Sequence, residues 1–261
     1  MSAPVAVVTG AAGGLGQALA AQLREAGFQV VAVTRECANL LVRKEVDDLA
    51  DQLCNSVQKV DVLINNAGAA FAHYAETVDG VERTHALNHL APFQLTHRLL
   101  ANGSLAPGAR IITIASDLVG RGRLDGSSPD VTGTSWRTNY SQLAVYGTAK
   151  LAAVLATSAL AERLPDGMTA FSANPGVIRT GFNAKAGGLL KLVSAVSNLF
   201  AASPEKAART PTMLATAATP PSPSGSLFVK GAAVTPPADP GLADEVYERT
   251  ASALGLQPLS R

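Results

Sequence analysis

The sequence predicts one α/β domain over 1–261, in which helices cover both faces of a doubly wound parallel sheet to give three layers. Hydrophobic residues make up 47% of the 261 residues, enough for a large core. Short apolar runs alternate with longer helical stretches along the chain. The runs are almost uninterrupted, as is typical of parallel strands buried on both faces. Ligands of such sheets bind beyond the carboxyl ends of the strands.

Six apolar runs predict the strands, at 5–9, 29–34, 60–65, 109–115, 168–174 and 226–230. Apolar residues at helical spacing predict the helices, at 14–26, 44–58, 81–101, 143–164, 204–217 and 242–254. The interval 36–60 is short, so we expect a lost helix there and only a stub of a further strand at 39–42. Two stretches, at about 117–145 and 181–203, break the alternation and are expected to form loops beside a substrate.

Composition excludes several classes of protein. The formal net charge is +1 and no block of basic residues occurs, so the sequence predicts no basic surface for binding nucleic acid. The two cysteines, Cys37 and Cys54, are not spaced as a redox or metal pair and predict free thiols in a reducing compartment. No leader is expected before the first strand. The longest apolar helical stretch, 151–161, is too short to span a bilayer, so we expect a soluble, cytoplasmic protein.

A glycine-rich turn joins the first predicted strand to the first predicted helix. Gly10 allows a sharp turn, Gly14 allows close approach of a phosphate, and Gly16 allows the helix to pack closely on the strand. The helix N-terminus then offers free N–H groups and a partial positive charge. A glycine-rich turn can also be only a turn. Its place at the first strand–helix junction of a parallel sheet favours a nucleotide-binding loop over a plain turn.

Five further motifs narrow the prediction. They are NNAG at 65–68, Asn88 within LNHLAPF, Ser116 after a strand, YGTAK at 146–150 and PGVIRT at 175–180. In this order, and over nearly the whole chain, they resemble the short-chain dehydrogenase/reductase family. The long interval from Ser116 to Tyr146 and the C-terminal part are most similar to its retinol-dehydrogenase-like branch and to related bacterial ketoreductases. The resemblance implies a Rossmann fold and hydride transfer between a nicotinamide cofactor and a carbonyl or alcohol.

The same resemblance implies the site residues. The implied catalytic residues are Asn88, Ser116, Tyr146 and Lys150. The implied cofactor-binding residues are Gly10, Gly14, Leu15, Gly16, Asn66, Ala67, Gly68, Tyr146, Lys150, Pro175, Gly176, Val177 and Thr180. Lys150 is further implied to hold the nicotinamide ribose, and Asn88 to support a water that relays protons.

The spacing and chemistry of Tyr146 and Lys150 support their catalytic role independently of the resemblance. Tyr146 and Lys150 are four residues apart on a predicted helix, so their side chains share a face. Lowering a phenol pKa of about 10 by about three units takes roughly 4 kcal/mol, and we expect the Lys150 ammonium to supply much of it. Ser116 would hold the carbonyl oxygen. Tyr140 is the nearby rival, but Ala144 stands where its lysine would be.

The end of the second predicted strand indicates the choice of cofactor. An acidic residue there selects NAD(H), whereas Thr34 and Arg35 stand in this chain. Arginine can bind a phosphate with two hydrogen bonds, so we expect NADP(H), with NAD(H) as the alternative. Arg35 could instead be a solvated loop residue, and Glu36 follows it at once.

Apolar residues in the two loops predict a bulky lipophilic or aromatic ketone as substrate. They are Leu118, Trp136, Phe182, Leu189, Leu190, Leu192, Val193 and Phe200. They could equally pack on the domain or on a partner subunit. His85 and His89 share a helix face, but no third ligand is evident, so we interpret them as packing residues and expect no metal.

The leading hypothesis is therefore an NADP(H)-dependent ketoreductase or alcohol dehydrogenase. A catalytically silent cofactor-binding regulator is a second hypothesis, although all four implied catalytic residues are intact. Double-bond reduction, epimerisation or dehydration on the same fold is a third. The resemblance favours a homodimer or homotetramer through helices 81–101 and 143–164, whose apolar faces could also be intramolecular core.

Overall fold

A computed structural model describes residues 2–57, 59–124, 126, 128–178, 201–235 and 240–261. Its strands form one seven-stranded sheet in the order β2-β1-β3-β4-β5-β6-β7. The strands are β1 (Val5–Thr9), β2 (Gln29–Val33), β3 (Val60–Asn65), β4 (Leu105–Ile114), β5 (Thr169–Asn174), β6 (Leu227–Val229) and β7 (Ala232–Val234). β1 to β6 are all parallel, and β7 pairs antiparallel with β6. The predicted doubly wound fold is confirmed.

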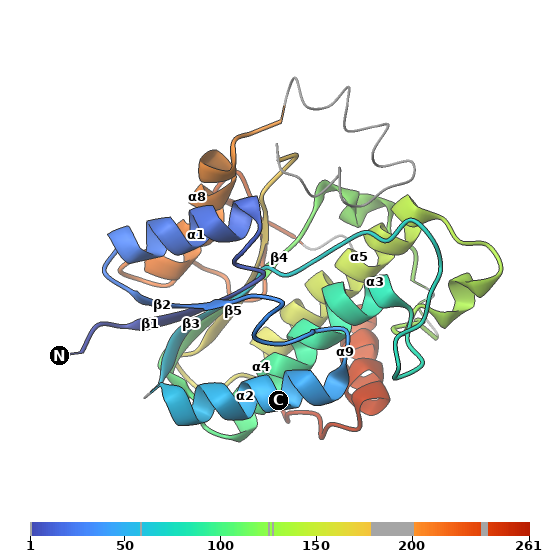
Figure 1. The fold of residues 1–261 in the computed structure, drawn as a ribbon, viewed down its shortest axis with the longest axis horizontal. Helices are drawn as coiled ribbons and strands as arrows, with labels where there is room; N and C mark the ends of the chain where they lie inside the picture. Colours follow the sequence, from blue (N-terminus) through green and yellow to red (C-terminus); the bar gives the residue numbers. More distant parts are fainter. Residues whose placement is uncertain (1, 58, 125, 127, 179–200, 236–239) are drawn as a thin grey trace.

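Helices cover both faces of the sheet (Figure 1). One face carries α1 (Gly14–Glu25) and α8 (Pro204–Thr216), packed over alternate strand residues such as Ala6, Val8 and Ile64. The other carries α2 (Arg43–Ser56), α4 (Ala91–Ala101), α5 (Gln142–Ala161) and α9 (Pro240–Leu254), packed over Val7 and Leu63. Successive side chains of a strand point to opposite faces, so one apolar strand supplies both cores.

The stretch predicted as one helix over 81–101 is three elements. A short α3 (Arg83–His85) leads into a π-helical turn η1 (Ala86–Leu90), and α4 follows. Two short 3₁₀ helices, η2 (Asp117–Arg121) and η3 (Thr134–Arg137), lie in the predicted loop at 117–145. A π turn widens a helix locally and often occurs at functional positions. Here it contains Asn88.

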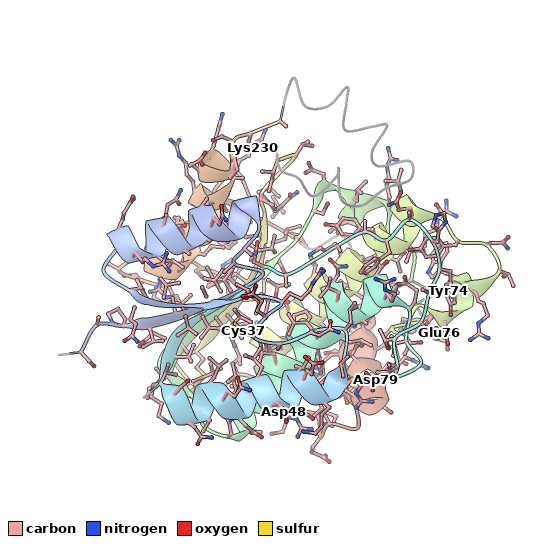
Figure 2. The ribbon with its side chains drawn as sticks, in the orientation of Figure 1. Cys37, Asp48, Tyr74, Glu76, Asp79 and Lys230 are labelled. Atoms are coloured by element: carbon pink, nitrogen blue, oxygen red, sulfur yellow. The ribbon has the colours of Figure 1, made fainter. Side chains whose placement is uncertain are left out.

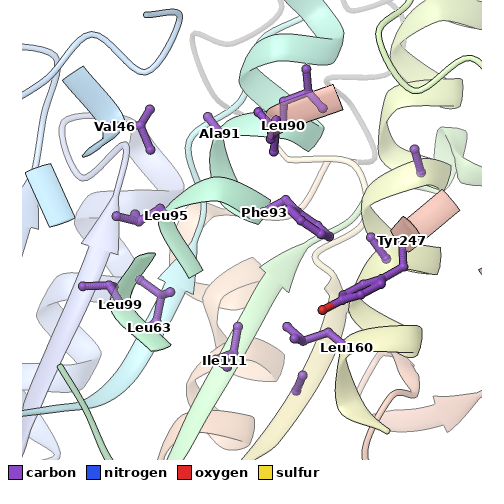
Figure 3. Packing of buried hydrophobic residues seen from close by; sticks show 14 of the residues in the cluster. Val46, Leu63, Leu90, Ala91, Phe93, Leu95, Leu99, Ile111, Leu160 and Tyr247 are labelled. Atoms are coloured by element: carbon purple, nitrogen blue, oxygen red, sulfur yellow. The ribbon is translucent and has the colours of Figure 1, made fainter. Parts of the chain in front are cut away.

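The C-terminal helix α9 packs along α5 and covers its outer side (Figure 1). Tyr247 of α9 lies between Phe93 of α4 and Leu160 of α5 in Figure 3, with its ring centroid 5.2 Å from that of Phe93. Arg163 anchors the pair with its guanidinium carbon 4.5 Å from the Tyr247 ring centroid. An oligomer interface was predicted on the apolar faces of helices 81–101 and 143–164. Much of this apolar surface is therefore part of the core within one chain.

Two corrections concern the sheet. No strand forms at 39–42: this segment turns directly into α2, while Leu40 and Leu41 reach the core with their side chains. The short exposed strand β7 was not predicted, because its alanine-rich sequence carries no strand signal.

The apolar helix α5 is longer than the predicted apolar stretch at 151–161. It has 20 residues and is long and apolar enough to cross a bilayer, so the prediction that this stretch is too short was wrong. However, 83% of its apolar window is buried inside the domain, as expected of a core helix.

Candidate active site

The glycine loop lies at the carboxyl end of β1, beside β2. The N–H of Ala11 donates to the carbonyl of Val33 at 3.1 Å, which fixes the loop against the end of that strand. Gly10 has φ +66°, a left-handed conformation that favours glycine, and a Cβ there would lie 2.8 Å from the Cα of Ala67. The loop can therefore pass this close to the neighbouring NNAG segment only with glycine at position 10.

Asn66 ties the NNAG segment to the glycine loop. Its Nδ2 donates to the carbonyl of Thr9 at 2.8 Å and to that of Gly10 at 3.3 Å. The hydroxyl of Thr9 in turn accepts from the backbone N–H groups of Asn66 and Ala67, both at 3.0 Å. The ends of β1 and β3 are thus held as one rigid unit, and Thr9 is a member of it that the sequence analysis missed.

In the described part of the chain, no side chain caps the N-terminus of α1. Gly13 provides the N-cap and so offers no side-chain hydrogen bond, and the first turn has no acidic residue. Leu15 and Gly16 are buried within the helix start. Free N–H groups and the positive end of the helix dipole suit a phosphate.

Ser116 stands two residues beyond β4 and caps η2. Its hydroxyl accepts from the N–H of Leu118 at 3.2 Å. The neighbouring Asp117 accepts from Asn174 Nδ2 at 2.7 Å, which joins the carboxyl ends of β4 and β5. η2 also packs closely on α5: a Cβ on Gly147 would lie 2.6 Å from the carbonyl oxygen of Leu118. Gly147 was not predicted from the sequence, although it directly follows the predicted catalytic tyrosine.

Tyr146 and Lys150 lie one helical turn apart on α5 and are both buried. The hydroxyl of Tyr146 is hydrogen-bonded to that of Ser116. Lys150 Nζ donates to the carbonyl of Ile114 at 2.7 Å and lies 5.8 Å from the centroid of the Tyr146 ring. The structure therefore brings Ser116, Tyr146 and Lys150 together at the end of β4.

The electrostatics differ from the expectation for Tyr146. Burial raises the pKa of Tyr146 to about 12, although the hydrogen bond with Ser116 acts to lower it. Burial also lowers the pKa of Lys150 to about 8. The ammonium of Lys150 donates to a backbone carbonyl rather than to the phenol, so the loss of hydration dominates. Tyr146 is therefore held in its hydroxyl form, which can give a proton.

Asn88 reaches the same space from the π turn. Its Nδ2 donates to the carbonyls of Ala69 at 2.7 Å and Thr84 at 2.8 Å. Its Oδ1 is buried and accepts no hydrogen bond from the residues that the structure describes. A Cβ on Gly68 would lie 2.6 Å from this oxygen and 3.4 Å from Lys150 Nζ, so the two polar atoms converge where only a glycine fits.

Arg35 lies two residues beyond β2 and is exposed. No ion pair or hydrogen bond joins its guanidinium to the described part of the chain. Since Ala11 contacts the end of the same strand, Arg35 stands beside the glycine loop. Its guanidinium can accept an anionic ligand without breaking an existing contact.

The remaining predicted residues lie at the edge of this site or outside the described range. Pro175, Gly176 and Val177 follow β5, and Val177 is 46% exposed. Leu118 packs with Tyr146, Ala70 and Leu143, which makes the surroundings of the phenol apolar.

Trp136 is half-buried on η3. Thr180 and the predicted wall residues of the second loop fall outside the described residues: Phe182, Leu189, Leu190, Leu192, Val193 and Phe200.

The two histidines weighed as metal ligands pack in the interior. His85 Nδ1 lies 3.2 Å from the carbonyl of Val131, and His89 Nε2 lies 2.8 Å from the hydroxyl of Thr250. Within the described residues no group of three metal-ligating side chains occurs.

The sequence is similar to a known family model and to known oxidoreductases. A family model described as the RmlD substrate binding domain matches residues 5–164, more than half of the chain. The "Putative daunorubicin C-13 ketoreductase DnrU" of Streptomyces sp. (strain C5) is 32% identical over 95% of this chain and 92% of its own length. Retinol dehydrogenase 13 of Homo sapiens is 30% identical over 96% of this chain and 84% of its own length.

Two solved structures share the fold. A crystal structure from Mycobacterium paratuberculosis has a TM-score of 0.73 and 26% identity, covering 99% of this chain and 98% of that one. A blue fluorescent protein from a metagenomic library, solved in complex with NADPH, has a TM-score of 0.64 and 25% identity. It covers 86% of this chain and 95% of its own.

Proposed function

Because the chain belongs to the short-chain dehydrogenase/reductase family, we propose that it is an NADP(H)-dependent oxidoreductase that interconverts a ketone and a secondary alcohol, with Tyr146 as general acid and base. The observation that carries this proposal is the meeting of Ser116, Tyr146, Lys150 and Asn88 beyond the ends of β3 and β4. This is the crevice in which ligands of a doubly wound sheet bind.

The residues present fit a nicotinamide dinucleotide. The uncapped N-terminus of α1 and the loop at Gly10 suit its pyrophosphate. The buried Oδ1 of Asn88 has no partner among the described residues and lies beside Lys150, which marks a polar space at the inner end of the crevice. When bound in reduced form, the nicotinamide supplies the hydride.

The side chains of the site divide the remaining work. Ser116 and Tyr146 present two hydroxyls to a carbonyl oxygen, and Tyr146 gives its proton to the alkoxide that develops there. The raised pKa of about 12 keeps Tyr146 protonated at neutral pH, as a reductase requires. Lys150 is the nearby cation for the phenolate that remains, and its lowered pKa of about 8 lets it exchange a proton near neutral pH.

NADP(H) is proposed over NAD(H) because of Arg35. Its exposed guanidinium beside the glycine loop can bind the additional phosphate with two charged hydrogen bonds. Replacing it (Arg35→Ala) should raise the KM for NADPH by about tenfold or more, because a hydrogen bond to a charged group contributes about 1.5–3 kcal/mol. The KM for NADH should not change. Arg24→Ala, at the exposed far end of α1, is the matched control.

A bulky lipophilic or aromatic ketone is proposed as the substrate. The phenol is surrounded by the apolar side chains of Ala70, Leu118 and Leu143. Two relatives are named as a daunorubicin C-13 ketoreductase and a retinol dehydrogenase. A homodimer or homotetramer would have to use a surface other than the side of α5 that α9 covers. The expected cytoplasmic location stays a prediction.

Oxidation of NADPH by a panel of aliphatic, aromatic and polycyclic ketones tests the proposal. Wild type should turn over a bulky ketone, and Tyr146→Phe should lose about 10²–10⁴-fold in kcat, the usual contribution of a general acid. Tyr74→Phe removes a surface hydroxyl and should leave kcat unchanged. Tight NADPH binding without turnover of any carbonyl would support the regulatory alternative. Full activity of Tyr146→Phe would refute the assigned role.

A further inference from the structure

The segment 69–71, directly after Gly68, is held by side chains from two other parts of the chain. Each of its three successive backbone carbonyls accepts a hydrogen bond from a side chain. The pairs are Asn88 Nδ2 with Ala69 at 2.7 Å, Gln142 Nε2 with Ala70 at 3.2 Å, and the Tyr140 hydroxyl with Phe71 at 2.8 Å. One of the three donors is a proposed catalytic residue. Of the other two, Tyr140 stands in the loop that precedes α5, and Gln142 is the first residue of that helix.

Tyr140 also reaches the elements that carry Asn88. Its hydroxyl oxygen lies 3.2 Å from the hydroxyl of Thr84, whose single proton can be donated either to Tyr140 or to the carboxylate of Glu82 at 2.9 Å. Glu82 and Thr84 have no exposed surface, and the Glu82 carboxylate caps α3 by accepting from the N–H of His85. A single phenol hydroxyl therefore bridges the segment 69–71 and the start of α3.

These contacts bear on the orientation of the Asn88 amide. Both acceptors of its Nδ2, the carbonyls of Ala69 and Thr84, belong to the two segments that Tyr140 bridges. With both N–H groups held, the amide can present only its Oδ1 to the space above Gly68 and beside Lys150. A shift of either segment would turn or displace this oxygen.

We propose that Tyr140 and Gln142 are positioning residues, which hold the segment 69–71 against the π turn and so fix the Asn88 amide in the site. This rests on the proposed function for its effect on catalysis. The carbonyls that Tyr140 and Gln142 hold belong to Phe71 and Ala70, beyond the predicted cofactor-binding residues 66–68, so loss of these hydrogen bonds should affect the chemical step and leave cofactor binding largely intact.

Removal of the two donors tests the inference. Tyr140→Phe keeps the ring, and Gln142→Leu keeps most of the volume. Each variant should lower kcat by about tenfold, since small displacements of a catalytic group have effects of this size or larger, while the KM for NADPH stays unchanged. Tyr74→Phe is the matched control: its ring is edge-on to that of Tyr140 at 6.1 Å, but its hydroxyl contacts exposed Glu76 (Figure 2).

A second measurement does not need turnover. The side-chain NH₂ of Asn88, assigned in isotope-labelled protein by its loss in Asn88→Asp, should exchange its protons slowly in wild type. Exchange should be about tenfold faster in Tyr140→Phe and in Gln142→Leu, because an acceptor of the amide becomes free to move. In Tyr74→Phe the exchange should stay at the wild-type rate.

The two readouts separate the two proposals. Faster exchange of the Asn88 amide in a protein that reduces no carbonyl would overturn the proposed function and support the positioning role. Unchanged kcat and unchanged exchange in both variants would overturn the positioning role while leaving the reductase proposal intact. A loss of kcat accompanied by an equal rise in the KM for NADPH would also overturn it, since that is the mark of general loosening.

Discussion

Moderate acid should destabilise this fold through two histidines buried beneath α9. His89 Nε2 lies 2.8 Å from the hydroxyl of Thr250, and His97 Nε2 lies 2.8 Å from that of Tyr247. Burial lowers the pKa of His89 from 6.5 to about 3, and the nearby charge of His85 adds to this. Burial lowers the pKa of His97 to about 4, although its bond to the Phe93 carbonyl opposes the shift.

The sign follows from where protons bind. Between the folded and unfolded pKa values, the unfolded chain takes up protons that the native protein refuses, so stability falls as the pH falls below 6.5. From pH 7 to pH 5, each histidine should cost about 2 kcal/mol of unfolding free energy, or about 4 kcal/mol together. A typical domain has only about 5–15 kcal/mol in total, so the effect should be large.

Urea unfolding at both pH values measures this loss. The double variant His97→Phe/Tyr247→Phe replaces both buried partners by apolar groups of similar shape and should lose about 2 kcal/mol less stability than wild type on acidification. His73→Gln removes an exposed histidine and should behave as wild type. A wild-type loss below about 1 kcal/mol would refute the reasoning, because two buried neutral histidines must give more. An unchanged loss in the double variant would show that His97 is not a source.

Three further predictions concern the site. Gly147→Ala should destabilise the fold by about 1–3 kcal/mol in thermal unfolding, since its Cβ meets a backbone carbonyl of η2, whereas Gly120→Ala, in open space, should be neutral. Gly68→Ala should abolish most reductase activity while leaving thermal stability close to wild type if the Asn88 side chain moves aside, which a crystal structure would show. The phenol of Tyr146 should stay protonated above pH 10 in the free protein, as difference absorbance against Tyr146→Phe would reveal; titration near the ordinary value would contradict the burial argument.

The strands were the most predictable part of this fold. β1 and β3 match their predicted ranges to the residue, because each is a mainly apolar run that ends in a polar residue. Helix positions were also predicted well, with ends that differ by a few residues, as is usual where helices fray. Helical spacing predicted that Tyr146 and Lys150 share a face, whereas the placing of Ser116 beside them was implied by the family resemblance.

Other features depend on contacts that no local pattern encodes. Leu40 and Leu41 read as a strand, but their side chains serve the core from a turn. The pKa of Tyr146 depends on how completely the folded chain excludes water, which outweighs the lysine four residues away. Tyr140 was set aside because it lacks a lysine partner, yet its hydrogen bonds join segments far apart in the sequence.

The covering of α5 by α9 has a consequence for biosynthesis. α5 is translated before β5, α8, β6 and β7, and the helix that shields it comes after all of these. While the ribosome completes that intervening stretch, the apolar helix α5, which is long enough to span a membrane, has left the exit tunnel before α9 exists to cover it. The nascent chain must therefore keep this surface from aggregating or from being taken up by membrane-targeting factors, which makes it a natural client for chaperones that bind exposed apolar helices. Native packing closes only when Tyr247 docks against Phe93.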